Sequence, residues 1–358
     1  MTRSYRPHDL HAARAAPLVL AAQNFFWVGA ERVELPTGAA LRGQTYVEYW
    51  IPEDLRHPLP IVMIHGGGGQ GTDMLGTADG REGWAKWFVR QGYAVYVIDR
   101  PGLGRAPYHP DLLGPMPPAG GAAFLEQMFC TPEAHPELYP QARLHDKWPG
   151  RGRIGDPCFD HFLAGTGPSP SDMHQAHLDA QRGGVALLDA IGPAILLTHS
   201  AGGPAGWLIA DGRPDLVRAI IAVEPLGPPA QALSGPLAWG IAAAPLTYDP
   251  PVTDPADLRF ELRAAPHPDL VDCFVQADPV RTLPNLRMPI VVVTAEASWM
   301  AADNHGMVDY LVQAGARAEH LRLEAHGVHG NGHAMMLETN SDDVAAVIAR
   351  WIEATGLA

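Results

Sequence analysis

The stretch from residue 198 to residue 202 reads Thr-His-Ser-Ala-Gly and could present Ser200 as a nucleophile. It lies between a short apolar run and a helical pattern, which is the strand–turn–helix setting of a nucleophile elbow. Small residues at Ala201 and Gly202 would let neighbouring backbones come close in a sharp turn, and the N–H dipoles of the next helix would point at the site. Thr198 replaces the first glycine of the usual pattern. A serine that only caps a helix is an equally good interpretation of these five residues alone.

One histidine and four glycines occupy positions 65–69, directly after an earlier apolar run. Lipases and esterases carry an oxyanion loop at this point, because glycine lets backbone N–H groups approach a developing oxyanion without obstruction by side chains. We therefore predict that the N–H groups of Gly67 and Ala201 form an oxyanion hole. A flexible turn or a phosphate loop is the alternative, but the pattern G-x-x-x-x-G-K-[ST] is absent, which disfavours a nucleotide site. Four residues are expected to line the substrate pocket: His65, Gly68, His199 and His329.

Three histidines, His326, His329 and His333, lie after the last apolar run and before the terminal helical pattern. A base that comes last fits the chain order serine, acid, histidine, and the three compete for this role. A metal site is the sharpest alternative because histidine is the commonest metal ligand. The run has no fixed helical register and no nearby cysteine, so no metal ion is expected. We expect His326 and His329 to be structural or to face solvent.

Two glutamates at predicted strand ends are candidates for the acid. Glu224 follows the strand after the elbow, and Glu296 follows the next strand, where the acid more often lies. Spacing alone therefore favours Glu296. A carboxylate on the surface is the alternative interpretation for either residue, since it is the usual state of a glutamate.

Local patterns predict the elements that must position these residues. Seven runs have the apolar or alternating pattern of strands: 44–51, 60–65, 93–98, 194–198, 219–223, 289–294 and 320–323. Five segments have a helical pattern, with Ser171 as the expected N-cap of the second: 83–91, 171–191, 201–211, 304–314 and 342–354. Strands that alternate with helices predict an α/β fold with a doubly wound sheet, mixed at its start and parallel inside. Such sheets bind ligands at the carboxyl ends of their strands, where every candidate residue lies.

The chain is expected to form one domain over residues 1–358. With 47% apolar and 18% charged residues, it can bury one large core. Two stretches at about 101–170 and 226–286 are rich in proline and glycine and show no sustained period. We interpret both as lid insertions over the strand ends.

Charge and cysteine content exclude several classes of partner. A net charge of -14 opposes binding to nucleic acid or to anionic lipid surfaces. Cys130, Cys158 and Cys273 are widely spaced, so neither a disulfide framework nor a cysteine metal site is indicated. We therefore expect a cytoplasmic location, with export as the alternative. The apolar run 15–22 is too short for a secretory signal, and no stretch reaches the roughly 20 apolar residues that a membrane span needs.

Further short motifs across the chain resemble those of one family. They are Gly80-Arg81-Glu82-Gly83-Trp84, Tyr96-Val97-Ile98-Asp99 followed by Gly102-Leu103-Gly104-Arg105, Val223-Glu224-Pro225, and residues 327–333 with Met335-Met336, together with His65-Gly66 and His199-Ser200. From about residue 25 to the C-terminus the chain resembles a small family of bacterial serine carboxylesterases with the α/β-hydrolase fold. That family carries two vicinal cysteines in its oxyanion loop and a glutamate acid after the strand that follows the elbow.

The resemblance implies Ser200 as nucleophile, Glu224 as acid and His333 as base, which leaves Glu296 as the alternative acid. Gly67 and Gly68 stand where the family has its cysteines, so a disulfide does not stiffen the loop here. Both insertions differ from that family's, the second being much longer, so we expect a different substrate pocket.

The expected activity is cleavage of a carboxylic ester through an acyl-enzyme, without a cofactor. An amidase, a lactonase or a carbamate hydrolase would use the same residues. A non-catalytic ligand-binding protein on this fold is the alternative of another class. The expected partner is a small-molecule ester, and the oligomeric state, a homodimer included, stays open.

Overall fold

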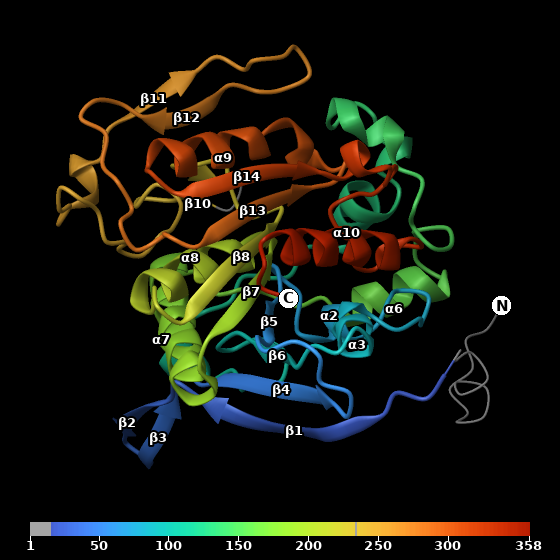
Figure 1. Ribbon diagram of the computed structural model, residues 1–358, viewed down its shortest axis with the longest axis horizontal. Helices are drawn as coiled ribbons and strands as arrows, with labels where there is room; N and C mark the ends of the chain where they lie inside the picture. The colour runs from blue at the N-terminus through green and yellow to red at the C-terminus, as the bar shows by residue number, and fades with distance from the viewer. Residues whose placement is uncertain (1–15, 233–234) are drawn as a thin grey trace.

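The computed structural model describes residues 16–232 and 235–358, and its central element is an eight-stranded sheet (Figure 1). The strands in spatial order are β1 Leu20–Val28, β4 Thr45–Pro52, β6 Val95–Asp99, β5 Ile61–Ile64, β7 Ala194–His199, β8 Val217–Val223, β13 Pro289–Thr294 and β14 Arg317–Arg322. β4 pairs antiparallel with both β1 and β6, and the remaining neighbours pair in parallel. The predicted α/β sheet, mixed at its start and parallel inside, is therefore confirmed.

Helices cover both faces of the sheet, because the strands are apolar on both sides. Ile61 of β5 belongs to one hydrophobic core and the next residue, Val62, belongs to the other. This alternation follows from the pleat, which points successive side chains to opposite faces. One face is covered by α3 Trp84–Arg90 and α10 Ser341–Ala354; the other is covered by α7 Met173–Ile191, α8 Gly203–Gly212 and α9 Asn304–Gln313.

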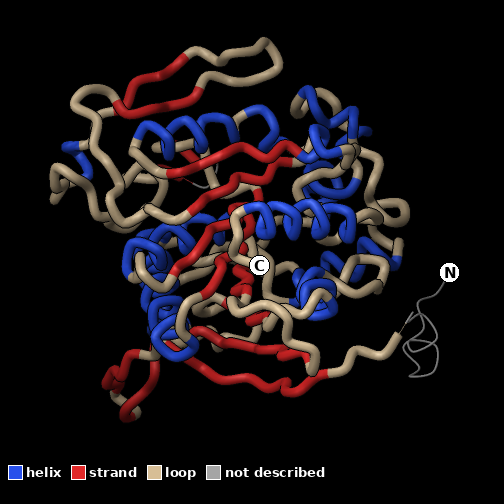
Figure 2. Tube along the Cα trace, in the orientation of Figure 1, coloured by secondary structure: helices blue, strands red, loops and turns tan. Residues whose placement is uncertain are grey.

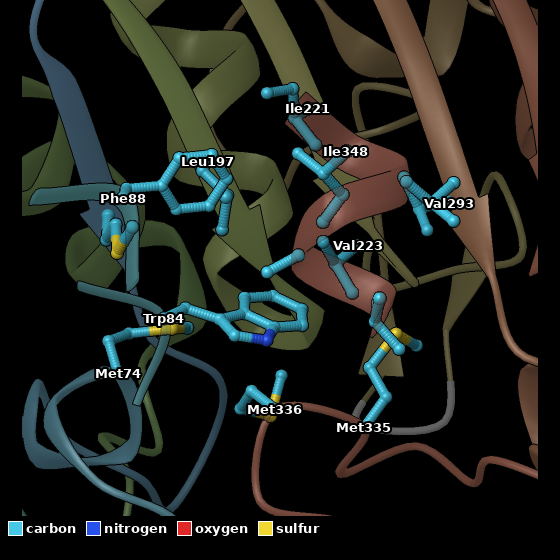
Figure 3. Close-up of a cluster of buried hydrophobic side chains, with 14 of the residues drawn as sticks. Met74, Trp84, Phe88, Leu197, Ile221, Val223, Val293, Met335, Met336 and Ile348 are labelled. Carbon is cyan, nitrogen blue, oxygen red and sulfur yellow. The ribbon is translucent and has the colours of Figure 1, made fainter. Parts of the chain in front are cut away.

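The hydrophobic core on the side of α3 and α10 also contains residues from the segment just before α10. Figure 3 shows Trp84 of α3 and Ile348 of α10 together with Leu197 and Val293 from the strands. Met335, close after the predicted catalytic histidine, is fully buried in the same core. The segment that carries the histidine is thus held by apolar packing as well as by its own hydrogen bonds.

The start of helix α7 differs from the prediction. α7 begins at Met173, and its N-cap is Asp172, whose side chain accepts a hydrogen bond from the Gln175 N–H at 3.0 Å. The predicted cap, Ser171, instead donates from its hydroxyl to the Pro115 carbonyl at 2.9 Å. An ionised aspartate is the stronger acceptor for a helix N-terminus, which explains the shift by one residue.

Three strands near the N-terminus were not predicted. They are the edge strand β1 and the hairpin of β2 Glu31–Leu35 and β3 Gly38–Arg42. Most side chains of β1 are exposed, so its sequence lacks the apolar pattern of a buried strand. The predicted strand 320–323 is also longer than expected, since β14 runs over Arg317–Arg322.

The two proline-rich stretches lie outside the central sheet. The first contains α4 Pro110–Leu113, α5 Ala122–Leu125, a π-helical turn Glu126–Cys130, 3₁₀ turns Pro132–Ala134 and Pro140–Leu144, and α6 Pro157–Gly165. The second contains β9 Gln231–Ala232, β10 Gly235–Pro236, a 3₁₀ turn Pro255–Asp257, β11 Phe260–Arg263 and β12 Cys273–Gln276. β12 packs against α9, and Figure 2 shows that loops make up most of this second stretch.

The apolar run 15–22 considered for a secretory signal lies partly outside the described residues. Its described part leads into β1. In the portion of the chain that the structure describes, no helix is long and apolar enough to cross a membrane.

Candidate active site

Ser200 occupies a strained turn between β7 and the helix that follows. Its backbone is left-handed, with φ 52°. A residue with a side chain rarely adopts this conformation, and it persists where the surrounding structure imposes it, often at functional sites. A 3₁₀ turn Ser200–Gly202 precedes α8, so the predicted helix 201–211 is regular only from Gly203 onward. The N-cap of α8 is Gly202, which excludes the interpretation of Ser200 as an ordinary helix cap.

The threonine that replaces the first glycine of the elbow pattern is accommodated by another glycine. Thr198 is fully buried in β7 and faces Gly206 of α8. A Cβ at Gly206 would lie 2.8 Å from Cγ2 of Thr198, closer than real Cβ contacts allow. Helix α8 can therefore approach the strand closely although position 198 carries a branched side chain.

Glu224 and His333 form a buried pair. Glu224 directly follows β8 and has a positive φ of 43°. Its Oε2 lies 2.5 Å from Nδ1 of His333. The hydroxyl of Ser298 donates to Oε2 at 2.7 Å, and the N–H of Ala295 donates to Oε1 at 2.8 Å. The carboxylate is thus fixed from several sides and can orient the imidazole through Nδ1, which directs Nε2 away from it.

Burial governs the protonation of this pair. Loss of hydration raises the pKa of the Glu224 carboxyl, against the hydrogen bonds from Ser298 and Ala295, which lower it. Loss of hydration also lowers the pKa of the His333 imidazole. His333 is therefore uncharged at neutral pH, as a general base must be before it takes a proton.

His333 lies beside the residue that precedes Ser200. His199 donates from Nε2 to the backbone carbonyl of His333 at 3.0 Å, and the two ring centroids are 4.6 Å apart. Among the residues that the structure describes, no hydrogen bond joins the Ser200 hydroxyl to the imidazole of His333. Contacts of this kind in free enzymes often tighten only when a substrate binds.

Glu296, the alternative acid, belongs to a different group. Its Oε2 accepts a hydrogen bond from the Gly330 N–H at 3.0 Å and lies 3.1 Å from Nδ1 of His329. The side chain of His329 is 60% exposed, and His326 is exposed as well. Both histidines face solvent, as predicted, and Glu296 braces their loop. Within the described ranges, no group of three or more His, Cys, Asp or Glu side chains could hold a metal ion.

The two predicted oxyanion donors lie on adjacent segments. A Cβ at Gly67 would lie 3.2 Å from the Cβ of Ala201, so the glycine loop and the elbow are in close contact. The neighbouring N–H, that of Gly68, donates to the hydroxyl of Ser169 at 2.9 Å. The carbonyl of Gly68 accepts a hydrogen bond from the N–H of Gly167 at 2.7 Å. The end of the first insertion thus braces the glycine loop, in the absence of the cysteines of the resembling family.

A cavity of about 270 Å³ opens between the glycine loop and the first insertion. Its lining is mainly apolar and comprises Gly66–Gly69, Asp73, Pro117–Gly120, Phe124, Leu125, Phe129, Phe162, Thr166–Ser169, His199, Ala334, Met336 and Leu337. No residue between 226 and 286 lines it, among those that the structure describes. The first insertion therefore shapes this cavity, whereas the second packs elsewhere.

Two of the four expected pocket residues lie outside this cavity. Gly68 and His199 line this cavity. His65 does not, because it is fully buried and its ring nitrogens contact the Gly66 carbonyl and the Arg100 N–H. His329 does not either, because its partner Glu296 holds it at the surface.

Several residues of the site were missed from the sequence. Ser298 and Ser169 had no signal, because a single serine in a loop has no periodicity or spacing that marks it. Arg100 did have a signal in the sequence. It follows directly after β6, and sheets of this kind bind ligands at the carboxyl ends of their strands.

Comparisons with known proteins agree with the observed fold. The sequence profile of the alpha/beta hydrolase family matches residues 61–347. The chain is similar to a probable secreted lipase of Fungal sp. (strain ATCC 74256), with 39% identity over 336 residues, 92% of this chain and 89% of that protein. It is also similar in structure to a novel bacterial esterase, with a TM-score of 0.61, 25% sequence identity, and coverage of 96% of this chain and 99% of that chain. The secreted relative gives no support to the expected cytoplasmic location.

Proposed function

The chain belongs to the alpha/beta hydrolase family and is an ester-acting hydrolase, and we propose that it cleaves carboxylic esters with Ser200, His333 and Glu224 as its catalytic triad. The observation that carries this proposal is the 2.5 Å contact between Glu224 and His333, in a loop that is hydrogen-bonded to His199, the residue before Ser200. The fully buried Glu224, with two further hydrogen bonds to its carboxylate, supports its role as the acid.

In the proposed mechanism, Oγ of Ser200 bonds to the ester carbonyl carbon while Nε2 of His333 takes its proton. Glu224 stabilises the charged imidazole that results. The imidazolium then returns the proton to the leaving alcohol as the carbon–oxygen bond breaks, which leaves an acyl group on Ser200. Water, deprotonated by the same imidazole, attacks the acyl carbon and releases the acid and the free serine.

The proposed oxyanion hole consists of the N–H groups of Gly67 and Ala201. Both would donate to the carbonyl oxygen as it gains negative charge, and each such donor lowers the barrier by about 2.7–4 kcal/mol in another serine hydrolase. Close contact between the glycine loop and the elbow supports this pairing.

We further propose that the substrate is a small-molecule ester with a compact apolar group. The cavity beside the glycine loop has a volume of only about 270 Å³, near the lower end of the size of ligand pockets. Phe124, Phe129 and Phe162 are among its walls, and they would favour an aromatic or branched aliphatic group over a long chain.

Labelling by a fluorophosphonate tests the nucleophile. We expect stoichiometric labelling of the wild type at Ser200, and neither labelling nor turnover in Ser200→Ala. A non-catalytic binding protein would not be labelled. Retained turnover in Ser200→Ala with an unchanged melting temperature would overturn the proposal.

A substrate panel tests the kind of bond and the size of the group. It comprises p-nitrophenyl esters of graded acyl length, a benzoate ester, and an anilide, a lactone and a carbamate of similar size. We expect the highest kcat/KM for short-chain or aromatic esters. Preference for the anilide, the lactone or the carbamate would assign an amidase, lactonase or carbamate hydrolase on the same triad.

A further inference from the structure

Arg100 is a buried cation between the two halves of the proposed oxyanion hole. It follows directly after β6 and is 8% exposed. Its Nη2 donates to the Gly66 carbonyl at 2.7 Å, and its Nη1 donates to the Ala201 carbonyl in a longer contact of 3.4 Å. Among the described residues, none places a carboxylate within ion-pair distance of its guanidinium. One charged side chain thus hydrogen-bonds both to the glycine loop, residues 65–69, and to the turn that carries Ser200.

The Gly66 carbonyl accepts a second hydrogen bond, from Nδ1 of His65 at 2.8 Å. The other ring nitrogen of His65, Nε2, accepts a hydrogen bond from the backbone N–H of Arg100 at 3.1 Å. Burial lowers the pKa of His65 to about 3, so the ring is neutral and carries its proton on Nδ1. His65 and Arg100 therefore form a closed set of hydrogen bonds around one carbonyl oxygen.

That carbonyl belongs to the same peptide unit as the N–H of Gly67. Because the unit is planar and trans, its C=O and N–H point in opposite directions, and whatever holds the carbonyl also aims the N–H. Two donors on the carbonyl also polarise the peptide, which makes its N–H a stronger donor. Glycine at 66 and 67 gives this segment no side chain of its own that could fix its orientation.

We propose that Arg100 is a positioning residue that holds the Gly67 N–H toward the developing oxyanion, with His65 as its neutral partner. The inference rests on the proposed function, because it assumes attack by Ser200. It differs from the roles already assigned, since Arg100 acts through the Gly66–Gly67 peptide.

The charge of Arg100 gives a second reason to assign it a role in the reaction. An arginine without a carboxylate partner is costly to bury, and a neutral donor could have bonded the same carbonyl at lower cost. Burial lowers the pKa of Arg100 to about 10, which leaves it charged at neutral pH. A positive charge behind the oxyanion hole favours the transition state, in which negative charge develops, over the neutral ester.

Two variants separate positioning from mere stabilisation of the fold. Arg100→Met removes the donors and the charge at similar length, and Arg100→Lys keeps the charge but loses the forked geometry. For each, kcat and KM for one ester are measured together with the affinity for a trifluoromethyl ketone, which forms a tetrahedral adduct with a serine, and for the uncharged product alcohol. Melting temperature and circular dichroism record the fold. Arg42→Lys is the control, because this arginine is largely buried on the β2–β3 hairpin and pairs with Asp179, away from the cavity.

We expect Arg100→Met to lower kcat by roughly 10²–10³, the effect of losing one oxyanion donor. Affinity for the trifluoromethyl ketone should fall in parallel, whereas KM and the affinity for the uncharged product alcohol should change less than about threefold. Arg100→Lys should lie between Arg100→Met and the wild type, and it decides the question if Arg100→Met does not fold. Arg42→Lys should keep wild-type kcat.

The proposal is overturned if a folded Arg100 variant keeps its kcat and its affinity for the ketone, or if the affinity for the product alcohol falls as much as the affinity for the ketone. Fluorophosphonate labelling of the wild type distinguishes the two possible failures. If labelling succeeds and the Arg100 variants are unimpaired, only the role of Arg100 is wrong. If labelling fails, the proposed triad and the role of Arg100 are both wrong.

Discussion

Glu224 and Glu296 lie after neighbouring strands of the sheet and contact different histidines. Glu224 is fully buried and holds His333, whereas Glu296 braces the exposed loop of His329. A buried carboxylate that contacts the base can stabilise the imidazolium of the transition state, and a carboxylate at an exposed turn has no such partner. Substitution of each glutamate separately can therefore show which of the two acts as the acid.

Exchange of each glutamate for glutamine tests the choice of acid. We expect Glu224→Gln to lower kcat by roughly 10⁴, the loss that follows when the acid of a serine protease triad becomes an amide. Glu296→Gln should change kcat by less than about threefold, since it contacts only an exposed turn. The amide keeps the shape of the side chain, so lost packing does not explain a difference. If Glu296→Gln instead shows the large loss of kcat, the acid is Glu296.

The pH profile tests the protonation of the base. Because burial lowers the pKa of His333, the imidazole should stay unprotonated well below the usual value of about 6.5. Burial raises the pKa of Glu224 to about 8, so for an ester without ionisable groups we expect any fall in kcat/KM to lie near pH 8 or below pH 6, with no inflection near pH 6.5. Melting temperatures over the same range separate loss of activity from unfolding. An acid limb at about pH 6.5 would contradict the effect of burial on His333.

At the scale of elements, close contact between β7 and α8 determines where the nucleophile lies. Gly206 lets α8 pass Thr198, and Gly202 lets the turn pass the β5 end, where a Cβ at 202 would lie 2.6 Å from the His65 carbonyl oxygen. At Gly206 the helix backbone meets the Thr198 side chain, and at Gly202 the turn meets the backbone at the end of β5. An added methyl group at either position must push the helix, and with it the turn of Ser200, away from the sheet.

A pair of substitutions tests this contact. Gly206→Ala should destabilise the protein by about 1–3 kcal/mol, because its Cβ overlaps Cγ2 of Thr198. Thr198→Ser removes that methyl group and should recover most of the loss in the double variant. Urea unfolding of the two single variants and the double variant measures the coupling, with Thr198→Ser alone as the control. Additive effects would mean that the two residues are not in contact.

At the scale of the whole molecule, a buried histidine joins the first insertion to the loop before the terminal helix. His145 lies 2.8 Å from Oε1 of Glu338 through Nε2, and 3.2 Å from Oε2 of Glu133 through Nδ1. Glu338 also accepts hydrogen bonds from the Gly332 N–H and from the Asn331 side chain. The insertion that shapes the cavity and the segment that carries His333 thus share one buried network.

This network predicts a pH-dependent stability. Burial lowers the pKa of His145, but hydrogen bonds and charges of Glu133 and Glu338 outweigh it and raise the pKa to about 9. Since the pKa is higher in the folded state than in the unfolded state, the contribution is fully present below about pH 6.5 and is lost as the pH rises through 9. It amounts to ~3 kcal/mol at most.

Comparison with His145→Gln isolates this contribution. The raised pKa of Glu224 also makes stability fall with rising pH, from its unfolded value toward about 8, but it does so in both proteins and cancels in the difference. We expect the difference in unfolding free energy to be largest at pH 6 and to shrink by pH 9.5. A difference that does not change with pH would mean that His145 is neutral in the folded protein.

Local patterns sufficed to place most candidates because strand ends and helix starts depend on near neighbours. An apolar run or a helical pattern marks Ser200, Glu224 and His333 as candidates, but only the family resemblance favours Glu224 over Glu296. Elements without such patterns were missed: β1 has mostly exposed side chains, and the first insertion is mostly short turns. Periodicity reports burial on one face and cannot report an edge strand that is exposed.

The amino-acid sequence alone predicts the doubly wound fold and a small set of chemically capable residues at its strand ends. Which of these residues meet depends on the packing of segments that are far apart in the chain. Glu224 and His333 are 109 residues apart, and whether His333 contacts Glu224 or Glu296 depends on how a whole loop packs. The same holds for Arg100 and the Ala201 carbonyl, which are 101 residues apart. Spacing along the chain carries no information about such contacts, because they result from the burial of apolar faces that brings distant strand ends to one edge of the sheet.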